Sequence, residues 1–149
     1  MREEKIRPIA ICVCHDGERI LVAEYLEKDR LYYRPLGGAI QFGEHGEEAV
    51  RREFREEILA DLSEVRYLGM LENIYDVEGV RAHQIVLVYD GRLSDASFYK
   101  KKSIQGDELG QPFKVVWKWL DEFGPGKPPV YPEGLLGLRR AGWHTIAQD

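Results

Sequence analysis

Apolar segments separated by polar turns follow one another along most of the chain, and they predict a series of short strands. The segment 6–14 is rich in Ile, Val and Cys, and 19–25 follows it after the turn-forming residues of 15–18. These two segments therefore predict a hairpin. Further strands are expected at 31–34, 39–42, 65–75, 80–90 and 113–119.

One segment has the period of a helix instead. Val50, Phe54 and Ile58 recur every four residues within 45–60, so they form an apolar stripe along one side of a helix. Strands outnumber helices, but both are present. The pattern therefore predicts an α+β fold, in which helices pack on a mixed sheet.

Two segments in the C-terminal half are less regular. The polar segment 94–110 predicts a loop with a strand remnant at 97–99. The segment 132–140 predicts a short helix with Pro132 in its first turn, where a missing N–H costs little.

Composition limits the possible functions. The 149 residues fit one domain, 1–149, and can bury a core of ordinary size. The net charge of −5 disfavours a protein that coats nucleic acid, although a metal ion would let an acidic protein bind an anionic substrate.

The N-terminal apolar run is too short for a membrane span and lacks a signal-peptide cleavage pattern, so we expect a cytoplasmic protein without a membrane partner. Cys12 and Cys14 read as small buried hydrophobes.

The helix of 45–60 also carries a cluster of carboxylates. At about 100° per residue, Glu53, Glu56 and Glu57 fall within one arc of about 100°, directly beside the apolar stripe. Like charges at this spacing repel by a few tenths of a kcal/mol per pair, roughly, and a divalent cation such as Mg²⁺ or Mn²⁺ would relieve them. The alternative is a solvated helix face whose charges are offset by nearby arginines.

The spacing around these carboxylates is specific. Gly38, five residues, Glu44, seven residues and then the run Arg52-Glu53-Phe54-Arg55-Glu56-Glu57 match the Nudix box, Gly-x5-Glu-x7-Arg-Glu-U-x-Glu-Glu-x-Gly-U, where U is bulky and aliphatic. The chain therefore resembles Nudix hydrolases of the MutT-like and ADP-ribose pyrophosphatase-like kind. The resemblance implies an α/β/α sandwich with a mixed sheet, and it covers the box strongly and residues 5–140 loosely.

The chain departs from the box at both ends of the helix. Leu59 stands where the family has Gly, and leucine in a left-handed conformation costs about 1–2 kcal/mol. We therefore expect the helix to run through Leu59 and to end near Ala60 or Asp61. At the start, His45-Gly46 makes a weak cap that the acidic pair Glu47-Glu48 partly compensates.

The resemblance implies a hydrolase that cleaves a nucleoside diphosphate linked to a group X, with divalent metal ions holding the diphosphate oxygens. Arg52 would then orient a glutamate through a charge-assisted hydrogen bond. The implied metal ligands are Glu53, Glu56, Glu57 and the Gly37 carbonyl, which the glycines let approach closely.

The remaining catalytic roles stay open. Glu44 is either an outer metal ligand or a support for the box. The base that activates water is expected to be Glu53 or Glu57. The alternative is Asp107 or Glu108 on the polar segment, which would swing over the site.

The sequence identifies the residues of the substrate pocket less specifically than those of the box. Arg34, Arg81 and Glu108 are candidates for substrate contacts. Four aromatic residues either stack a base or are ordinary core or surface aromatics: Tyr32, Tyr75, Phe98 and Tyr99. The expected partner is a small nucleoside diphosphate derivative; the net charge argues against RNA, and a homodimer is compatible with the resemblance. A non-catalytic nucleotide-binding module of the same fold is the alternative function, although such modules typically lose box glutamates that this chain keeps.

Overall fold

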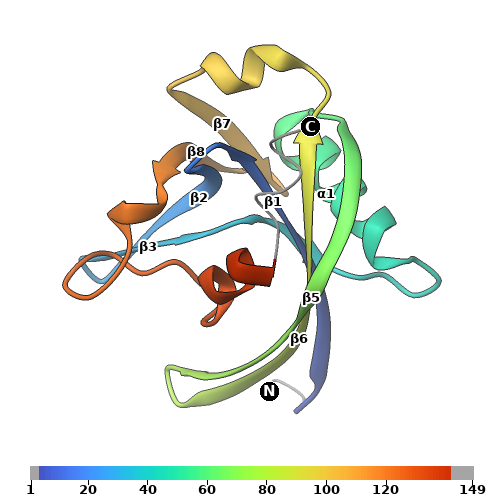
Figure 1. Ribbon diagram of the computed structural model, residues 1–149. Coiled ribbons are helices and arrows are strands. Elements are labelled where there is room, and N and C mark those ends of the chain that lie inside the picture. The colour runs from blue at the N-terminus through green and yellow to red at the C-terminus, as the bar shows by residue number, and fades with distance from the viewer. Residues whose placement is uncertain (1–3, 142–149) are drawn as a thin grey trace.

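The computed structural model describes residues 4–141, and strands make up most of it (Figure 1). The strands are β1 Ile6–Asp16, β2 Arg19–Glu27, β3 Arg30–Arg34, β4 Leu36–Ala39, β5 Leu62–Val77, β6 Val80–Leu93, β7 Ser103–Glu108 and β8 Gln111–Trp119. The helices are the α-helix α1, Gly46–Ile58, and the 3-10 helices η1 Ala96–Lys100, η2 Leu120–Glu122 and η3 Leu135–Ala141.

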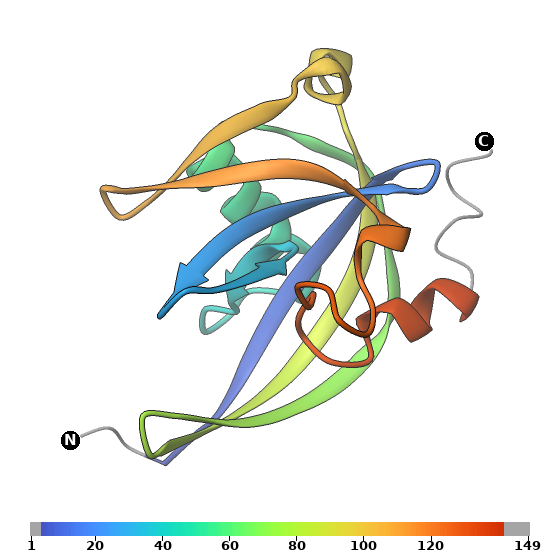
Figure 2. The same cartoon turned by 90° about the vertical axis from the view of Figure 1, so that its left-hand side faces the viewer.

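The strands hydrogen-bond in the order β5-β6-β1-β2-β8-β7, with β4 added to β1 and β3 added to β2. β1 runs parallel to β6, with Ile9 beside Val86, whereas the other strand pairs are antiparallel. β1 meets β2 only at its end, where His15 lies opposite Ile20. The long β5–β6 hairpin and the β7–β8 hairpin therefore project in different directions from β1 (Figure 2). The predicted mixed sheet and α+β class are confirmed.

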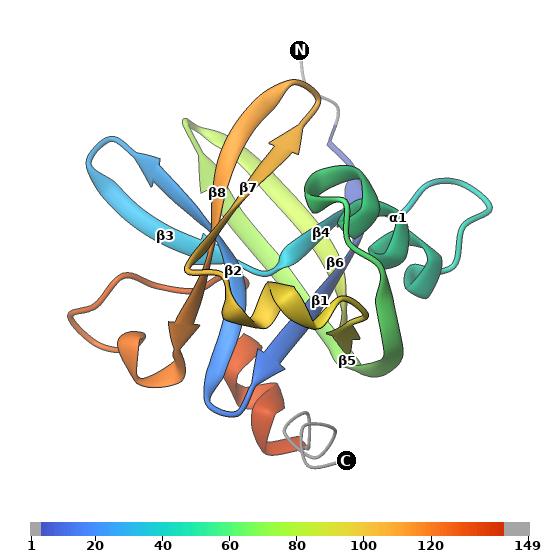
Figure 3. The same cartoon turned by 90° about the horizontal axis from the view of Figure 1, so that it is seen from above.

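Successive side chains of a strand point to opposite faces, and this alternation gives the molecule two cores. One core lies beneath α1, where Val50 and Phe54 pack with Ala10, Leu21 and Val115. The other lies on the opposite face, and η3 contributes Leu135 to it; the strand residues there include Ile11, Val13, Ile20, Val22 and Val88. Seen from above, α1 and η3 flank the strands (Figure 3).

Several smaller sequence predictions are confirmed and others are wrong. Cys12 and Cys14 are fully buried free thiols in the core beneath α1, as expected, and burial raises the pKa of the Cys12 thiol. The strand expected at 39–42 instead occupies Leu36–Ala39, because both glycines of β4 pair with β1. Phe42 lies beyond this strand and is fully exposed.

The segment predicted as a loop at 94–110 is mostly ordered structure. Residues 97–99 lie in η1, not in a strand, and β7 follows and pairs with β8. Pro132 lies before the first residue of η3, so it is outside the helix that it was expected to start.

The predicted end of the glutamate helix is also wrong. α1 ends at Ile58, and Leu59 is left-handed with φ 55° and ψ 39°. Its N–H donates to the Arg55 carbonyl and that of Ala60 to the Phe54 carbonyl, which closes the helix end. The reversal brings Ala60 into the core at 2% exposure, whereas the Leu59 side chain stays in solvent at 86%. Burial of the residues after the helix therefore outweighs the local strain of Leu59.

Among residues 4–141, α1 and the 3-10 helices are all too short or too polar to cross a membrane.

Candidate functional site

α1 presents its glutamates at the edge of its buried face. Val50, Phe54 and Ile58 are buried as the stripe predicted, and Glu57 is buried beside them at 7% exposure. The side chain of Glu53 is 16% exposed and that of Glu56 is 59% exposed. The three carboxylates therefore form a gradient from the core to the solvent, rather than an evenly solvated face.

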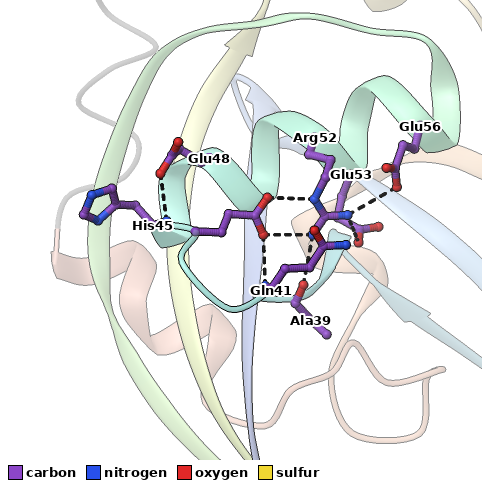
Figure 4. Close-up of polar contacts among 8 residues, drawn as sticks. Ala39, Gln41, His45, Glu48, Arg52, Glu53 and Glu56 are labelled. Atoms are coloured by element: carbon purple, nitrogen blue, oxygen red, sulfur yellow. Dashed lines mark hydrogen bonds and ion pairs between the residues drawn. The ribbon is translucent and has the colours of Figure 1, made fainter.

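Arg52 is the centre of a polar network at the start of this edge (Figure 4). Its Nε and Nη2 donate to the two oxygens of Glu44 at 2.7 and 3.0 Å, which is a bidentate ion pair. Nη1 donates to Glu53 at 3.0 Å and to Glu56 at 3.3 Å, and Nη2 also donates to the Ala39 carbonyl at 3.0 Å. One guanidinium thus connects α1 to Glu44 in the loop 40–45 and to Ala39 at the end of β4.

Glu44 is held from both sides. Its Oε1 also accepts the backbone N–H of Gln41 at 3.0 Å, and the Glu44 N–H donates back to the Gln41 carbonyl at 3.0 Å. The hydrogen bonds from Arg52 lower the pKa of the Glu44 carboxyl and raise that of the guanidinium, so both groups stay ionised. This geometry favours the supporting role among the two roles expected for Glu44.

The helix start is better capped than the sequence suggested. The Glu48 carboxylate accepts the backbone N–H of His45 at 2.8 Å, which satisfies one of the free donors at the helix end (Figure 4). Glu47 lies in the same turn, where a negative charge is favoured by the helix dipole.

The two glycines of β4 allow close approach on either side of the strand. A Cβ on Gly37 would overlap the Ala10 carbonyl of β1, whereas a Cβ on Gly38 would lie 2.6 Å from Oε1 of Glu53. The strand is therefore pressed between β1 and the carboxylate of Glu53. No other residue type leaves room for Glu53 at Gly38 without a shift.

Glu57 has an unusual environment for a carboxylate. Among the described residues its buried Oε2 has no hydrogen-bond partner. Burial raises the pKa of Glu57 to about 8, with further contributions from the negative charges of Glu53 and Glu108, and Arg34 opposes the shift. Burial also raises the pKa of Glu53. A positive charge at this point would stabilise both carboxylates.

The strands that face α1 supply the other charged groups. Arg34 of β3 lies opposite Ala23 of β2, whose side chain belongs to the core beneath α1, so Arg34 points to the same face. On β7, Glu108 shares this face with Ile104, which is in the same core, whereas Asp107 points away. The strand register therefore turns Arg34 and Glu108 toward Glu57. It also distinguishes Glu108 from Asp107, which the sequence could not do.

The structure places Arg81 elsewhere. Its side chain is 73% exposed near the turn of the β5–β6 hairpin, where it pairs with Asp76 at 3.3 Å. Figure 2 shows the end of that hairpin away from α1. Arg81 therefore does not join the residues around Glu57.

One residue near the glutamates was not singled out from the sequence. Tyr25 of β2 shares the face of Arg34, and the pKa of its phenol is raised by burial, lowered by Arg34, and raised by Glu57 and Glu108. An apolar-polar pattern cannot separate such a tyrosine from a core tyrosine. The one signal in the sequence is that Tyr25 follows Leu21 and Ala23 at spacings of four and two residues, which places all three side chains on the same strand face.

A divalent cation would suit this donor set. Carboxylate oxygens are the ligands that Mg²⁺ and Mn²⁺ prefer, and the unpartnered Oε2 of Glu57 is such an oxygen. Within residues 4–141, no three His, Cys, Asp or Glu side chains are already arranged as a metal cage. Arg52 instead lies between Glu44, Glu53 and Glu56, so a cation would compete with the guanidinium for two of the glutamates.

Comparison with solved structures gives the same fold. The MutT NUDIX hydrolase from Burkholderia pseudomallei superposes with a TM-score of 0.68 over 91% of this chain and 98% of that chain, at 21% identity. A NUDIX hydrolase from Nitrosomonas europaea gives a TM-score of 0.64 over 96% of this chain and 91% of that chain, at 14% identity. At these identities the likeness concerns the fold.

Comparison with curated proteins matches a shorter segment. The NAD-capped RNA hydrolase NudC of Mycobacterium tuberculosis is 39% identical over 66 residues, which are 44% of this chain and 21% of that protein. The match to the protein of the same name in Mycobacterium bovis has the same extent, so the matched segment spans about a fifth of the length of these relatives. A family model described as NUDIX domain matches residues 5–123. Because that match covers most of the sequence and contains the whole box, the chain belongs to the NUDIX family.

Proposed function

We propose that this protein is a divalent-metal-dependent pyrophosphohydrolase, which cleaves the pyrophosphate linkage of a nucleoside diphosphate joined to a second group X. The observation that carries the proposal is the environment of Glu57, whose carboxylate is buried, lacks a partner on Oε2 among the described residues and lies next to Glu53. Without a cation this burial keeps the Glu57 carboxyl protonated near neutral pH, since its pKa is raised to about 8, and a bound divalent cation would let it ionise. NUDIX membership and the hydrolase neighbours support this enzyme class.

The residues of the box would have separate roles in metal binding. Glu53, Glu56, Glu57 and the Gly37 carbonyl would hold Mg²⁺ or Mn²⁺, which would polarise the phosphate oxygens and the attacking water. Arg52 would keep Glu53 and Glu56 aligned, because it holds both while its own position is fixed by Glu44. Gly38 would preserve the space that the Glu53 carboxylate needs.

Three carboxylates remain candidates for accepting the proton of water. Burial raises the pKa of Glu57 to about 8 in the metal-free protein, and a nearby cation would lower it, so Glu57 would be in the ionised form that accepts a proton. Glu53 is the second candidate, with a pKa that burial also raises. Glu108 reaches the same face from β7 without any loop movement.

Arg34 would bind the anionic part of the substrate. It faces α1 from β3 and is the basic group that lowers the pKa of Glu57. A guanidinium suits paired phosphate oxygens because it donates in a planar fork. Arg81 lies apart from these groups, so we assign it no substrate contact.

The identity of X is tested with a substrate panel. The protein with Mg²⁺ is incubated with nucleoside triphosphates, ADP-ribose, nucleotide sugars, dinucleotides and capped RNA, and phosphate products are measured. NAD-capped RNA belongs in the panel because the mycobacterial relative is an NAD-capped RNA hydrolase. We expect turnover of small nucleoside diphosphate derivatives and little of RNA, since the net charge is −5.

The residue test compares Glu57→Gln with Glu47→Gln. Glu47 lies on the same helix but outside the cluster, where it pairs with Arg51 at 3.2 Å. Glu57→Gln is expected to lower kcat by at least about 100-fold, and Glu47→Gln to leave it within about twofold. Near-normal turnover in Glu57→Gln would remove Glu57 from the site. Tight binding of one nucleotide without turnover of any would favour the alternative, a non-catalytic binding module.

A further inference from the structure

A second feature of the molecule lies beyond Arg34. A cavity of about 490 Å³ opens between the β2–β3 hairpin, β5 and the segment that precedes η3. Its volume is within the range of small-molecule sites. Arg34, Tyr32, Tyr75 and Tyr131 line it together. The cavity therefore brings three tyrosines from distant parts of the chain to one place.

Tyr32 is held rigidly at the wall of this cavity. Its ring stacks on Tyr25 at 5.0 Å between centroids and 14° between planes, and it meets Tyr131 edge-on at 5.7 Å and 60°. Its hydroxyl donates to Glu27 at 3.1 Å. Two fixed rings at a steep angle form a corner in which a flat group can stack on one ring while meeting the other at its edge.

Arg34 connects this corner to the glutamates. Tyr32 and Arg34 are two residues apart on β3, so both point to the face that looks toward α1. Arg34 lines the cavity and also acts electrostatically on Glu57 and on Tyr25. A substrate whose phosphates lie at Arg34 and Glu57 would therefore project one of its ends past Arg34 into the corner.

The charge of the cavity limits what this end can be. Arg34 is at the glutamate side, and only two other basic residues, Lys28 and Arg30, are among the described lining residues. Five acidic residues line the same cavity: Glu27, Glu72, Asp76, Glu78 and Glu133. Asp76 is paired with Arg81 and Glu78 with Lys28, so the excess of negative charge comes from Glu27, Glu72 and Glu133. An anionic group beyond Arg34 would be repelled by Glu27, Glu72 and Glu133, whereas a cationic ring would be attracted by these three acids and by the tyrosine faces.

We propose that the Tyr32–Tyr131 corner binds a planar ring of neutral or positive charge, so the preferred substrate carries such a ring beyond the diphosphate and not a further phosphate. The part concerning substrate preference rests on the proposed pyrophosphohydrolase function. The site itself does not, because a ring can bind without being cleaved.

The other aromatic candidates from the sequence do not compete for this role. Tyr99 stacks on Trp117 at 5.3 Å, and Phe98 is buried at 7% exposure in the core beneath α1. Tyr75 does line the cavity, where its hydroxyl accepts a hydrogen bond from Gln84 at 3.3 Å. It would form the opposite wall.

The test measures the binding of three ribonucleosides in metal-free buffer with EDTA. Nicotinamide riboside, adenosine and orotidine carry ring charges of about +1, 0 and −1 near pH 7. Their dissociation constants are obtained from NMR-detected titrations of the full chain. We expect nicotinamide riboside to bind tightest and orotidine weakest, with about threefold or more between successive ligands.

Variants locate the binding. Tyr32→Ala should weaken nicotinamide riboside and adenosine about 10-fold, as is typical of a lost stacking partner, whereas Tyr32→Phe should keep them. Tyr67→Ala is the matched control, because Tyr67 is an exposed tyrosine with a similar edge-on contact, to Tyr89, outside the cavity. Glu133→Lys, at an exposed position, should bring orotidine binding close to that of adenosine.

The proposal is overturned if orotidine binds as tightly as nicotinamide riboside, or if Tyr32→Ala changes neither dissociation constant. The hydrolysis panel separates the two proposals. Ring binding that follows the prediction, with no hydrolysis of any substrate, would refute only the proposed function. Hydrolysis in which Tyr32→Ala leaves both KM and the nucleoside dissociation constants unchanged would refute only the ring site.

Discussion

Replacing Glu57 with glutamine should stabilise the metal-free protein at alkaline pH. The pKa of this carboxyl is raised to about 8 in the folded protein, against 4.5 for an ordinary glutamate. In the folded state the group therefore holds its proton to higher pH than in the unfolded chain. The contribution of Glu57 to the stability of the folded protein is therefore fully present below pH 4.5. This contribution is lost as the pH rises through 8.

The size of the loss follows from the same two values. Each unit of pKa difference corresponds to about 1.4 kcal/mol, so the full difference sets a ceiling of about 5 kcal/mol. Neighbouring charges readjust as Glu57 ionises, and we expect about 2–4 kcal/mol at pH 8. Glutamine has the shape of the protonated acid and no proton to lose, so the Glu57→Gln variant should not show this loss of stability.

The assay is urea unfolding in EDTA at pH 5, 6.5 and 8. The two proteins should have free energies of unfolding within about 1 kcal/mol of each other at pH 5, with the variant more stable by about 2–4 kcal/mol at pH 8. Glu47→Gln, at an exposed site, should follow the unsubstituted protein throughout. Mg²⁺ should restore stability at pH 8 only where Glu57 is present. Parallel pH curves for Glu57→Gln and the unsubstituted protein would refute the reasoning.

Three further substitutions test the geometry around the box. Leu59→Gly should stabilise the protein by about 0.5–1 kcal/mol in urea unfolding, because relief of the left-handed strain exceeds the cost of the added flexibility of glycine. Leu59→Ala should change the stability little, since the side chain is in solvent. Equal effects of the two substitutions would show that backbone strain is not the cause. Gly38→Ala should lower kcat about 100-fold by displacing Glu53, with the unfolding free energy within about 1 kcal/mol of normal; unchanged kcat would contradict the close approach. Arg52→Lys keeps the charge but loses the bidentate bond to Glu44, so unfolding should become about 1–2 kcal/mol easier and kcat should fall about 10-fold; a lysine that fully substitutes would contradict the clamp.

The local patterns predicted much of this structure because they report local physics. The stripe of Val50, Phe54 and Ile58 identified α1 and its buried side, and the same spacing placed three glutamates at the edge of that side. The box spacing added Gly38, and the structure places this glycine against the carboxylate of Glu53, a contact that the sequence did not predict. These features depend on neighbours along a single helix or loop.

The wrong predictions concern choices that distant residues make. Leu59 is left-handed because Ala60 must enter the core, which no propensity of leucine indicates. β7 looks like a loop in the sequence because it is polar, and it becomes a strand by pairing with β8. That pairing also turns Glu108 toward the glutamates and Asp107 away from them, a distinction that requires the register.

Metal binding is the decisive test of whether the β4 glycines and the α1 glutamates form one metal site. Mn²⁺ is titrated into the protein, and free and bound ion are distinguished by electron paramagnetic resonance. We expect saturable binding that is weakened at least about 10-fold by Glu57→Gln and by Gly38→Ala and is kept in Glu47→Gln, with hydrolysis lost in the two variants that bind Mn²⁺ weakly. Equal Mn²⁺ affinity in all four proteins would contradict this expectation.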